Sequence, residues 1–183
     1  PTRADFDGQS VLIAVYAFAV QIYFDFSGYT DIARGCAKLM GFEFNLNFNL
    51  PYLAANPREF WQRWHISLSS WLRDYLYIPL GGNRKGRVRT SINLMATMLL
   101  GGLWHGAAWT YVLWGAYQGA LLIVHRWTEP LLARTGRMMP AWSKDLRKVL
   151  TIAAFFHLTC LGWLIFRADS VAHLGTLFGA LLC

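Results

Sequence analysis

The chain has 183 residues, of which 55% are hydrophobic and only 15% are charged, and its formal net charge is +7. Such a composition argues against a soluble enzyme, whereas the length would supply several membrane helices at about 20 residues each. Three widely spaced cysteines form no Cys-x-x-Cys pair, which indicates neither a disulfide framework nor a zinc site.

The basic residues gather in two segments, 84–89 and 126–148. Loops rich in Lys and Arg beside apolar spans tend to lie on the cytoplasmic side, so we expect both segments there. A nucleic-acid-binding surface would instead combine basic and aromatic residues on a soluble face, and no nucleic-acid partner is expected.

The first apolar run covers residues 11–26 and ends in the polar sequence Asp25-Phe-Ser-Gly-Tyr-Thr-Asp31. Its carboxylates, serine and glycine allow two interpretations. The segment is either broken or re-entrant, with irregular backbone sheltered by protein, or Asp25 or Ser27 caps a helix that continues to Met40.

Residues 41–56 have the composition of a loop. Phenylalanine and leucine alternate there with Glu and Asn over 42–50, a pattern typical of a strand. Because a lone strand at a membrane would leave its edges unpaired, we expect an extended interfacial segment instead.

Asn56 carries the signature of a helix start, since Pro57 follows at the first helical position and Glu59 stands where a capping box requires it. The helix is expected to run to Ile78, before Pro79. Its large apolar residues recur at steps of three and four, so the helix is amphipathic and should lie at the interface or line a polar cavity.

Residues 91–127 are strongly apolar but carry Trp104-His105-Gly106 near the middle. Two short helices meeting near 101–106 would bring both basic segments to one side, although each half would then be too short for a normal bilayer. The alternative is one long tilted helix followed by an interfacial turn. Residues 149–166 form the clearest single span.

Two of the five histidines stand out by their context. His125 and His173 lie near segment ends, and His157 can be satisfied by a hydrogen bond to a neighbouring helix. His65 lies near the apolar face of its helix, and His105 has small neighbours that allow either close helix packing or a narrow ligand passage. An ionisable group at membrane depth is a functional-site hypothesis, so His65 and His105 are the catalytic candidates.

Neither candidate has a partner at the spacing of a metal site, and the chain has no Gly-x-Ser-x-Gly elbow or Gly-rich phosphate loop. Acid–base chemistry remains, because imidazole can accept a hydroxyl proton near neutral pH. A base without a protein nucleophile fits direct transfer between two bound substrates, so we expect no metal and no resident cofactor.

Four stretches occur in a fixed order: 25–35 (DFSGYTDIARG), 59–69 (EFWQRWHISLS), 73–82 (RDYLYIPLGG) and 103–106 (LWHG). Together they resemble the membrane-bound O-acyltransferases (MBOAT), and most closely the bacterial branch that acetylates alginate and other exported polysaccharides. The resemblance implies an all-α polytopic membrane protein, with a helical bundle around a central tunnel. It also suggests that residues 1–183 are part of one integral-membrane domain, a fragment without its N-terminal helices and C-terminal end.

The resemblance further implies an acyltransferase of the bacterial inner membrane, surrounded by lipid. The acyl group, expected to be acetyl, would come from a thioester donor on the cytoplasmic side, either acetyl-CoA or an acyl-carrier protein. The acceptor would be a hydroxyl of an exported or envelope polysaccharide, reached directly or through a periplasmic acetyltransferase that relays the group.

By motif position, His105 corresponds to the family's essential histidine and His65 to the second histidine of its active site. We expect His105 to take the acceptor proton and His65 to position the acceptor or to stabilise the oxyanion. Trp64 and Trp104 are expected to wall the tunnel, with Ser67 beside them as a further substrate-binding candidate.

Arg63 and Arg73 are candidates to hold anionic donor phosphates. For Arg73, an ion pair with Asp74 or a contact with lipid headgroups is an alternative, and Asp74 therefore joins the candidate set.

Two other functions are compatible with histidines in apolar segments. A transporter or channel would show substrate flux without acyl turnover. A non-catalytic scaffold of a polysaccharide-export complex would tolerate replacement of both histidines.

Overall fold

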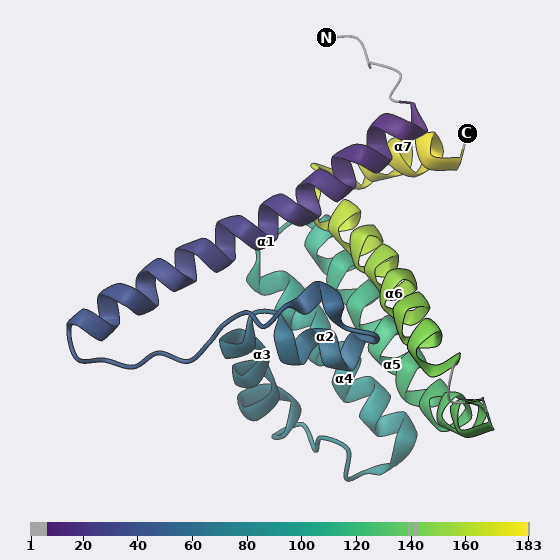
Figure 1. Cartoon of the computed structure of the whole chain (residues 1–183), viewed down its shortest axis with the longest axis horizontal. Coiled ribbons are helices and arrows are strands. Elements are labelled where there is room, and N and C mark those ends of the chain that lie inside the picture. Colours follow the sequence, from purple (N-terminus) through teal and green to yellow (C-terminus); the bar gives the residue numbers. More distant parts are fainter. Residues whose placement is uncertain (1–6, 139, 141–142, 183) are drawn as a thin grey trace.

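The structure is a computed structural model that describes residues 7–138, 140 and 143–182. Over these residues the chain is helical and contains no β-strand, as expected (Figure 1). Two helices, α1 (Gly8–Leu39) and α6 (Ser143–Arg167), are long and apolar enough to cross a membrane. Residues 149–166, the span expected from the sequence, lie within α6.

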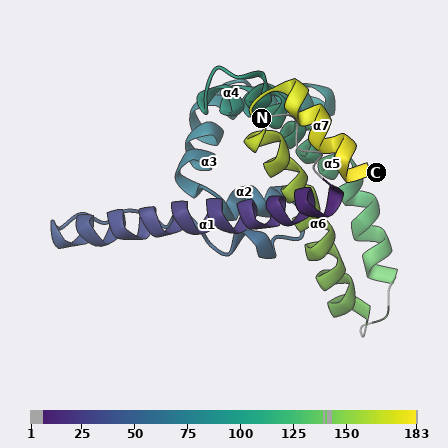
Figure 2. The same cartoon turned by 90° about the horizontal axis from the view of Figure 1, so that it is seen from above.

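Helix α1 is continuous from Gly8 to Leu39, so both interpretations of residues 25–31 are wrong. Its N-terminus is capped by Asp7, whose carboxylate accepts a hydrogen bond from the Ser10 amide at 2.7 Å. The hydroxyl of Thr30 donates to the Ser27 carbonyl at 3.0 Å, which satisfies this polar group without any break in the helix. The second half of α1 projects away from the other helices (Figures 1 and 2).

The segment after α1 is neither helix nor strand until the short 3-10 turn η1 (Pro51–Leu53), which confirms the extended segment. It returns from the tip of α1 to the body of the molecule (Figure 1). There it is tied to the next elements, since the Asn49 amide donates to the Arg63 carbonyl and the Ile66 amide to the Asn47 carbonyl, each at 2.9 Å.

Asn56 caps the next helix, as predicted. Its side-chain oxygen accepts from the Glu59 amide at 2.9 Å, while the Glu59 carboxylate accepts from the Ala55 amide rather than from that of Asn56. The capping box is therefore displaced by one residue, and it starts α2 (Pro57–Arg63).

The single helix expected from Asn56 to Ile78 is wrong, because the chain bends at residues 64–65. Trp64 is extended and His65 is left-handed, with φ 42°. Two shorter elements follow, α3 (Ile66–Leu72) and the π-helical turn η2 (Arg73–Tyr77). The amides that the bend frees are bonded by Asn47 of the preceding loop, a long-range contact that helical periodicity cannot reveal.

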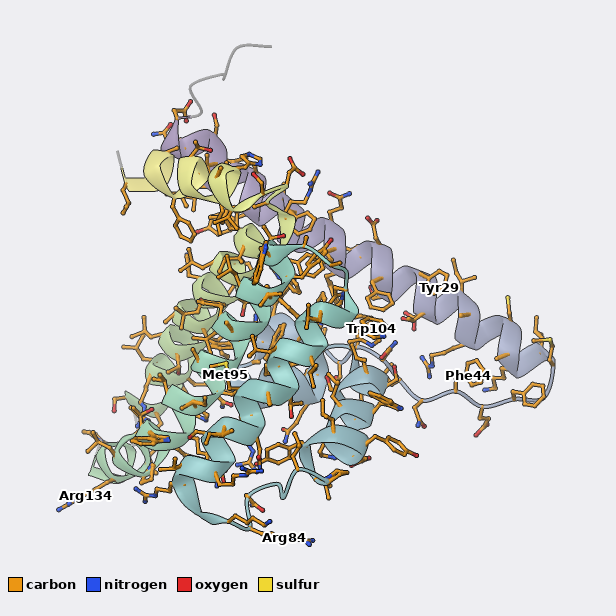
Figure 3. The ribbon with its side chains drawn as sticks, turned by 180° about the vertical axis from the view of Figure 1, so that it is seen from behind. Tyr29, Phe44, Arg84, Met95, Trp104 and Arg134 are labelled. Atoms are coloured by element: carbon orange, nitrogen blue, oxygen red, sulfur yellow. The ribbon has the colours of Figure 1, made fainter. Side chains whose placement is uncertain are left out.

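Helices α4 (Gly86–Trp104) and α5 (Trp109–Met138) confirm the two-helix interpretation of residues 91–127 and contradict one long helix. With 19 and 30 residues they extend for about 28 and about 45 Å, so α5 is longer than the short half-helix expected, but neither is among the described helices that are both long and apolar enough to cross a membrane. Their far ends carry the two basic segments, and Figure 3 shows Arg84 and Arg134 at the same end of the molecule.

Helix α6 packs beside α5, and the last helix, α7 (Val171–Leu182), lies against the start of α1 (Figures 1 and 2). Aromatic side chains from α2, α5 and α6 fill the space between these helices. The largest buried members of this core are Phe48, Phe60, Trp64, Trp114, Phe155 and Trp163. The core thus fixes the α2–α3 bend against α6, and with it the position of His65.

Candidate active site

A cavity of about 520 Å³, here called the histidine cavity, lies where α1, the α2–α3 bend, the α4–α5 turn and α6 meet. Both catalytic candidates, His65 and His105, line it, although they are 40 positions apart in the sequence. The rest of the wall is mainly aromatic and includes Phe26, Trp61, Trp64, Trp104, Trp114, Trp163 and Phe166. The fold therefore brings together the two histidines that the sequence singled out.

His65 is held on two sides. The edge of the Phe26 ring meets its imidazole at 4.7 Å between ring centroids. On the other side, Nδ1 lies 3.3 Å from the side-chain oxygen of Asn47 and 3.4 Å from the Ser67 hydroxyl. The ring is thus oriented by polar contacts from a loop that lies well before it in the chain.

His105 ends α4, and its amide donates to the Gly102 carbonyl at 3.0 Å. Its ring meets those of Trp104, Trp114 and Phe166 nearly at right angles, with centroids 5.0, 5.2 and 5.1 Å away. Within the described part of the chain, no hydrogen bond reaches this ring. His105 therefore sits in an aromatic cage with its nitrogens unengaged.

The turn after His105 requires a glycine at position 106, for two reasons. The φ of Gly106 is 150°, and a Cβ there would lie 2.8 Å from a ring carbon of Tyr111. Both the backbone conformation and the close approach of Tyr111 favour glycine. The Tyr111 ring in turn lies 6.2 Å from that of His105, so this contact helps to shape the cavity wall.

Both imidazoles lie outside α1 and α6, the two described helices that are both long and apolar enough to cross a membrane. Burial lowers the pKa of His105, and burial together with the nearby His105 lowers the pKa of His65 to about 4. Burial penalises the charged form of an imidazole, so both rings are neutral at pH 7 and can accept a proton.

The cavity wall also contains buried donors that lack an acceptor in the described part of the chain. They are the indole N–H groups of Trp61, Trp114 and Trp163. An unpaired buried donor costs about 1–3 kcal/mol. These N–H groups are buried behind the wall surface, so a substrate oxygen could bond to one of them only after the wall rearranged.

Apart from Arg73, which lines a second cavity, the remaining candidates from the sequence fall into two groups. Trp64 and Trp104 line the histidine cavity, Trp64 buried at 5% exposure and Trp104 exposed at 62%. Arg63, Ser67 and Asp74 line neither this cavity nor the second one described below.

Arg63 and Ser67 instead hold the loop before α2. Arg63 pairs with Glu59 at 2.7 Å and donates to the Asn49 carbonyl at 3.3 Å. The Ser67 hydroxyl donates to the Asn47 side-chain oxygen at 3.0 Å. Both residues therefore support the α2–α3 bend in this structure.

A second cavity of about 690 Å³, here called the arginine cavity, is lined by residues of α2, α3, η2, α4 and α5. Its charged lining residues are Arg58, Arg73, Arg126 and Glu129, and His125 and Tyr77 also line it. The guanidinium of Arg58 lies 3.7 Å from the Glu129 carboxylate, which leaves the lining with a net positive charge. Trp61 borders both cavities and so stands between them.

Within the arginine cavity, Arg73 forms the ion pair that the sequence allowed as an alternative. It donates to the Asp74 carboxylate at 2.7 and 3.0 Å, and this hydrogen bonding lowers the pKa of Asp74. Arg73 is thus partly neutralised, while Arg126 has no carboxylate partner among the described residues.

Sequence reasoning missed Asn47, which contacts His65, and Arg58 and Arg126, which line the arginine cavity. Asn47 is one of several asparagines in an alternating loop, and nothing in that pattern distinguishes it. The only available signal for Arg126 was its place in a basic segment that ends an apolar helix.

Comparison with known proteins places these motifs in one family. The model of the membrane-bound O-acyltransferase family matches residues 7–166. The chain is 48% identical over 169 residues to the probable alginate O-acetylase of Pseudomonas fluorescens, covering 92% of this chain and 32% of that protein.

Two more distant relatives are named for other acceptors. The peptidoglycan O-acetyltransferase of Helicobacter pylori is 42% identical over 155 residues, which is 85% of this chain and 28% of the relative. The teichoic acid D-alanyltransferase of Bacillus subtilis is 31% identical over 169 residues, 88% of this chain and 42% of the relative. The chain spans about a third of the length of its alginate O-acetylase relatives. From the extent of the family match, the chain belongs to the membrane-bound O-acyltransferase family.

Proposed function

We propose that the protein is an O-acetyltransferase that esterifies hydroxyl groups of an exported or cell-envelope polysaccharide. The observation that carries this proposal is the pair of histidines, His65 and His105, on one aromatic cavity, where burial lowers the pKa of both rings and favours their neutral form. The names of the relatives support the choice of acetyl and polysaccharide, because two of the three are O-acetyl-transferring proteins and all act on envelope or exported polymers.

In the proposed reaction, a neutral His105 nitrogen takes the proton of the acceptor hydroxyl while the hydroxyl oxygen attacks the thioester carbonyl. The tetrahedral intermediate collapses as the carbon–sulfur bond breaks, and the leaving thiolate recovers the proton from His105. The result is an ester and a free thiol. Hydrogen-bond donors of the cavity wall, among them the unpaired indole of Trp114 once the wall has rearranged, would stabilise the oxyanion.

The donor is proposed to lie with its phosphates in the arginine cavity. A thioester carried on a phosphopantetheine arm, as in acetyl-CoA or an acyl-carrier protein, is anionic at one end and neutral at the reacting end. The net positive arginine cavity suits the anionic end of the donor, and the aromatic histidine cavity beyond Trp61 suits its neutral, reacting end. The arginine cavity also lies near the basic end of the molecule, because its lining residue Asn83 directly precedes Arg84, which lies at that end (Figure 3).

This placement of the donor predicts a specific defect for Arg126→Gln in the full-length protein. Loss of one hydrogen-bonded charge is worth about 1.5–3 kcal/mol, so the KM for the donor should rise about tenfold or more while kcat stays close to that of wild type. Arg84→Gln is the matched control, because it removes the same charge from a residue outside the cavity lining. An unchanged donor KM in Arg126→Gln would contradict the placement.

The basic end of the molecule is proposed to face the cytoplasm, with the protein in the bacterial inner membrane. The acceptor would then arrive at the histidine cavity from the other side, either as the polymer itself or as a periplasmic protein that carries the acetyl group onward. Both alternatives require the same chemistry at His105.

Mass spectrometry of envelope and secreted polysaccharides tests the proposed function directly. Deletion of the gene should remove an acetyl ester from one polymer, and the wild-type gene should restore it. If the acylation pattern of every polymer is the same in the deletion and parent strains, the proposed function is wrong.

A further inference from the structure

Asn47 bonds the α2–α3 bend through both its backbone and its side chain. Its carbonyl accepts from the Ile66 amide at 2.9 Å, and its side-chain oxygen accepts from the Ser67 amide at 3.1 Å. These two amides begin α3 and would otherwise lack partners, because the first amides of a helix have none within it. Asn47 therefore caps α3 from a loop that precedes the helix by about 20 residues.

The Ser67 contact also fixes which end of the Asn47 amide faces His65. A backbone N–H can only donate, so the side-chain atom opposite the Ser67 amide must be the oxygen. The same oxygen lies 3.3 Å from Nδ1 of His65 and 3.0 Å from the Ser67 hydroxyl.

This arrangement determines the protonation of the ring. An unprotonated Nδ1 would place its lone pair against that of the Asn47 oxygen, whereas a protonated Nδ1 can donate to it. The Ser67 hydroxyl, 3.4 Å from Nδ1, donates its own hydrogen to Asn47 and offers a lone pair to the same N–H. With the hydrogen on Nδ1, each of these contacts joins a donor to an acceptor and the Asn47 oxygen is shared among three donors, whereas an unprotonated Nδ1 would face that oxygen with no hydrogen between them.

We propose that Asn47 is a positioning residue that holds neutral His65 as the Nδ1–H tautomer, so that Nε2 presents a lone pair to the histidine cavity. Within the described part of the chain Nε2 has no hydrogen-bond partner, and the ring lines that cavity.

This tautomer distinguishes the two roles considered for His65, which are to position the acceptor or to stabilise the oxyanion. In this tautomer a neutral His65 accepts a hydrogen bond at Nε2 and has no hydrogen there to give to an oxyanion. It therefore orients the acceptor through a hydroxyl other than the one that His105 deprotonates, and oxyanion stabilisation falls to other donors of the wall. This catalytic consequence rests on the proposed acyl transfer, whereas the tautomer itself does not.

The left-handed backbone of His65 supports the same role for Asn47. A non-glycine residue at φ 42° costs about 1–2 kcal/mol and persists only where its surroundings fix it. Here the Asn47 contacts on residues 66 and 67 hold the chain immediately after His65. One loop residue thus fixes both the direction of the ring and the position of its hydrogen.

Nitrogen NMR of the full-length protein, labelled with 15N in its histidine rings and held in lipid nanodiscs, tests the tautomer without any activity assay. The His65 signals are identified by their loss in His65→Gln. The expected result is a protonated Nδ1 and an unprotonated Nε2 in the wild type at pH 7. A wild-type His65 with its hydrogen on Nε2 overturns the proposal, whether or not any variant folds.

Variants of Asn47 test whether this residue sets the tautomer of His65. Asn47→Leu should move the hydrogen away from Nδ1, while Asn47→Asp, which keeps an acceptor oxygen, should preserve the wild-type tautomer. Asn45→Leu is the matched control, since Asn45 is an exposed residue of the same loop. A folded Asn47→Leu protein with an unchanged His65 tautomer contradicts the assignment.

Kinetics of the same variants test the catalytic consequence. Asn47→Leu should lower kcat about tenfold or more with an unchanged donor KM, and Asn47→Asp should restore most of kcat. If the tautomer is as expected but none of these proteins, wild type included, transfers an acyl group, then the proposed function is wrong and the tautomer assignment stands.

Discussion

His105→Ala in the full-length protein is expected to abolish acyl transfer while expression and membrane insertion persist. A positioned general base contributes about 10²–10⁴-fold to a rate, and in the proposed mechanism His65 binds another hydroxyl of the acceptor and does not take the place of His105. The His105 ring makes aromatic contacts and no hydrogen bond among the described residues, so its removal should cost activity far more than folding. The measurement is the acetyl ester content of the polymer after complementation of the deletion strain.

Two companion variants make the result specific to a proton acceptor. His157→Ala removes an imidazole that lines neither cavity and should leave transfer within about twofold of wild type. His105→Gln keeps a polar side chain of similar reach but has no basic nitrogen, so it should be as inactive as His105→Ala. Transfer at more than about a tenth of the wild-type rate in His105→Gln would remove the base assignment.

The parts of this architecture that the sequence predicted have local causes. The start of α2 depends on Asn56, Pro57 and Glu59, three neighbours whose capping geometry is set within one helical turn. The interruption at His105 depends on the small residues around it. In such places the chemistry of adjacent residues determines the backbone, and the periodicity of the sequence is informative.

The parts that the sequence did not predict depend on contacts between distant segments. Residues 57–78 read as one helix, yet the chain bends at His65, where Asn47 supplies hydrogen bonds that a continuous helix would have made itself. Residues 25–31 read as an interruption, yet α1 continues through them because hydroxyls such as that of Thr30 bond to carbonyls within the helix. Polar residues in an apolar run do not reveal which of these outcomes applies.

The candidate site shows the same division. The two histidines were found from motif and context, but their common cavity exists only because α1, α4 and α6 converge on the α2–α3 bend. The arginine cavity combines α2 and α5 through Arg58 and Arg126, which are 68 positions apart in the sequence and share no motif.

Gly102→Ala is expected to damage both the stability and the activity of the full-length protein, because α4 and α5 meet there without space for a side chain. A Cβ at Gly102 would collide with the Tyr111 carbonyl and lie 3.2 Å from the Cα of Gly115. Backbone cannot give way as a flexible side chain can, so the helices must separate, at about 1–3 kcal/mol for overpacking of this kind. The Gly102 carbonyl also accepts the His105 amide, so the displaced helix carries the proposed base with it.

Thermal unfolding and acyl transfer, measured on the same preparation, distinguish this effect from a general intolerance of alanine. Gly175→Ala is the matched control, since it lies in helix α7 with nothing within 4 Å of the added carbon, and it should leave both quantities unchanged. Gly115→Ala should behave like Gly102→Ala, because a Cβ there would meet the Met98 carbonyl at the same crossing. The double variant should then cost less than the sum of the two single variants, because helices already separated by one methyl group have room for the second. Strict additivity would mean that the two glycines do not share one contact.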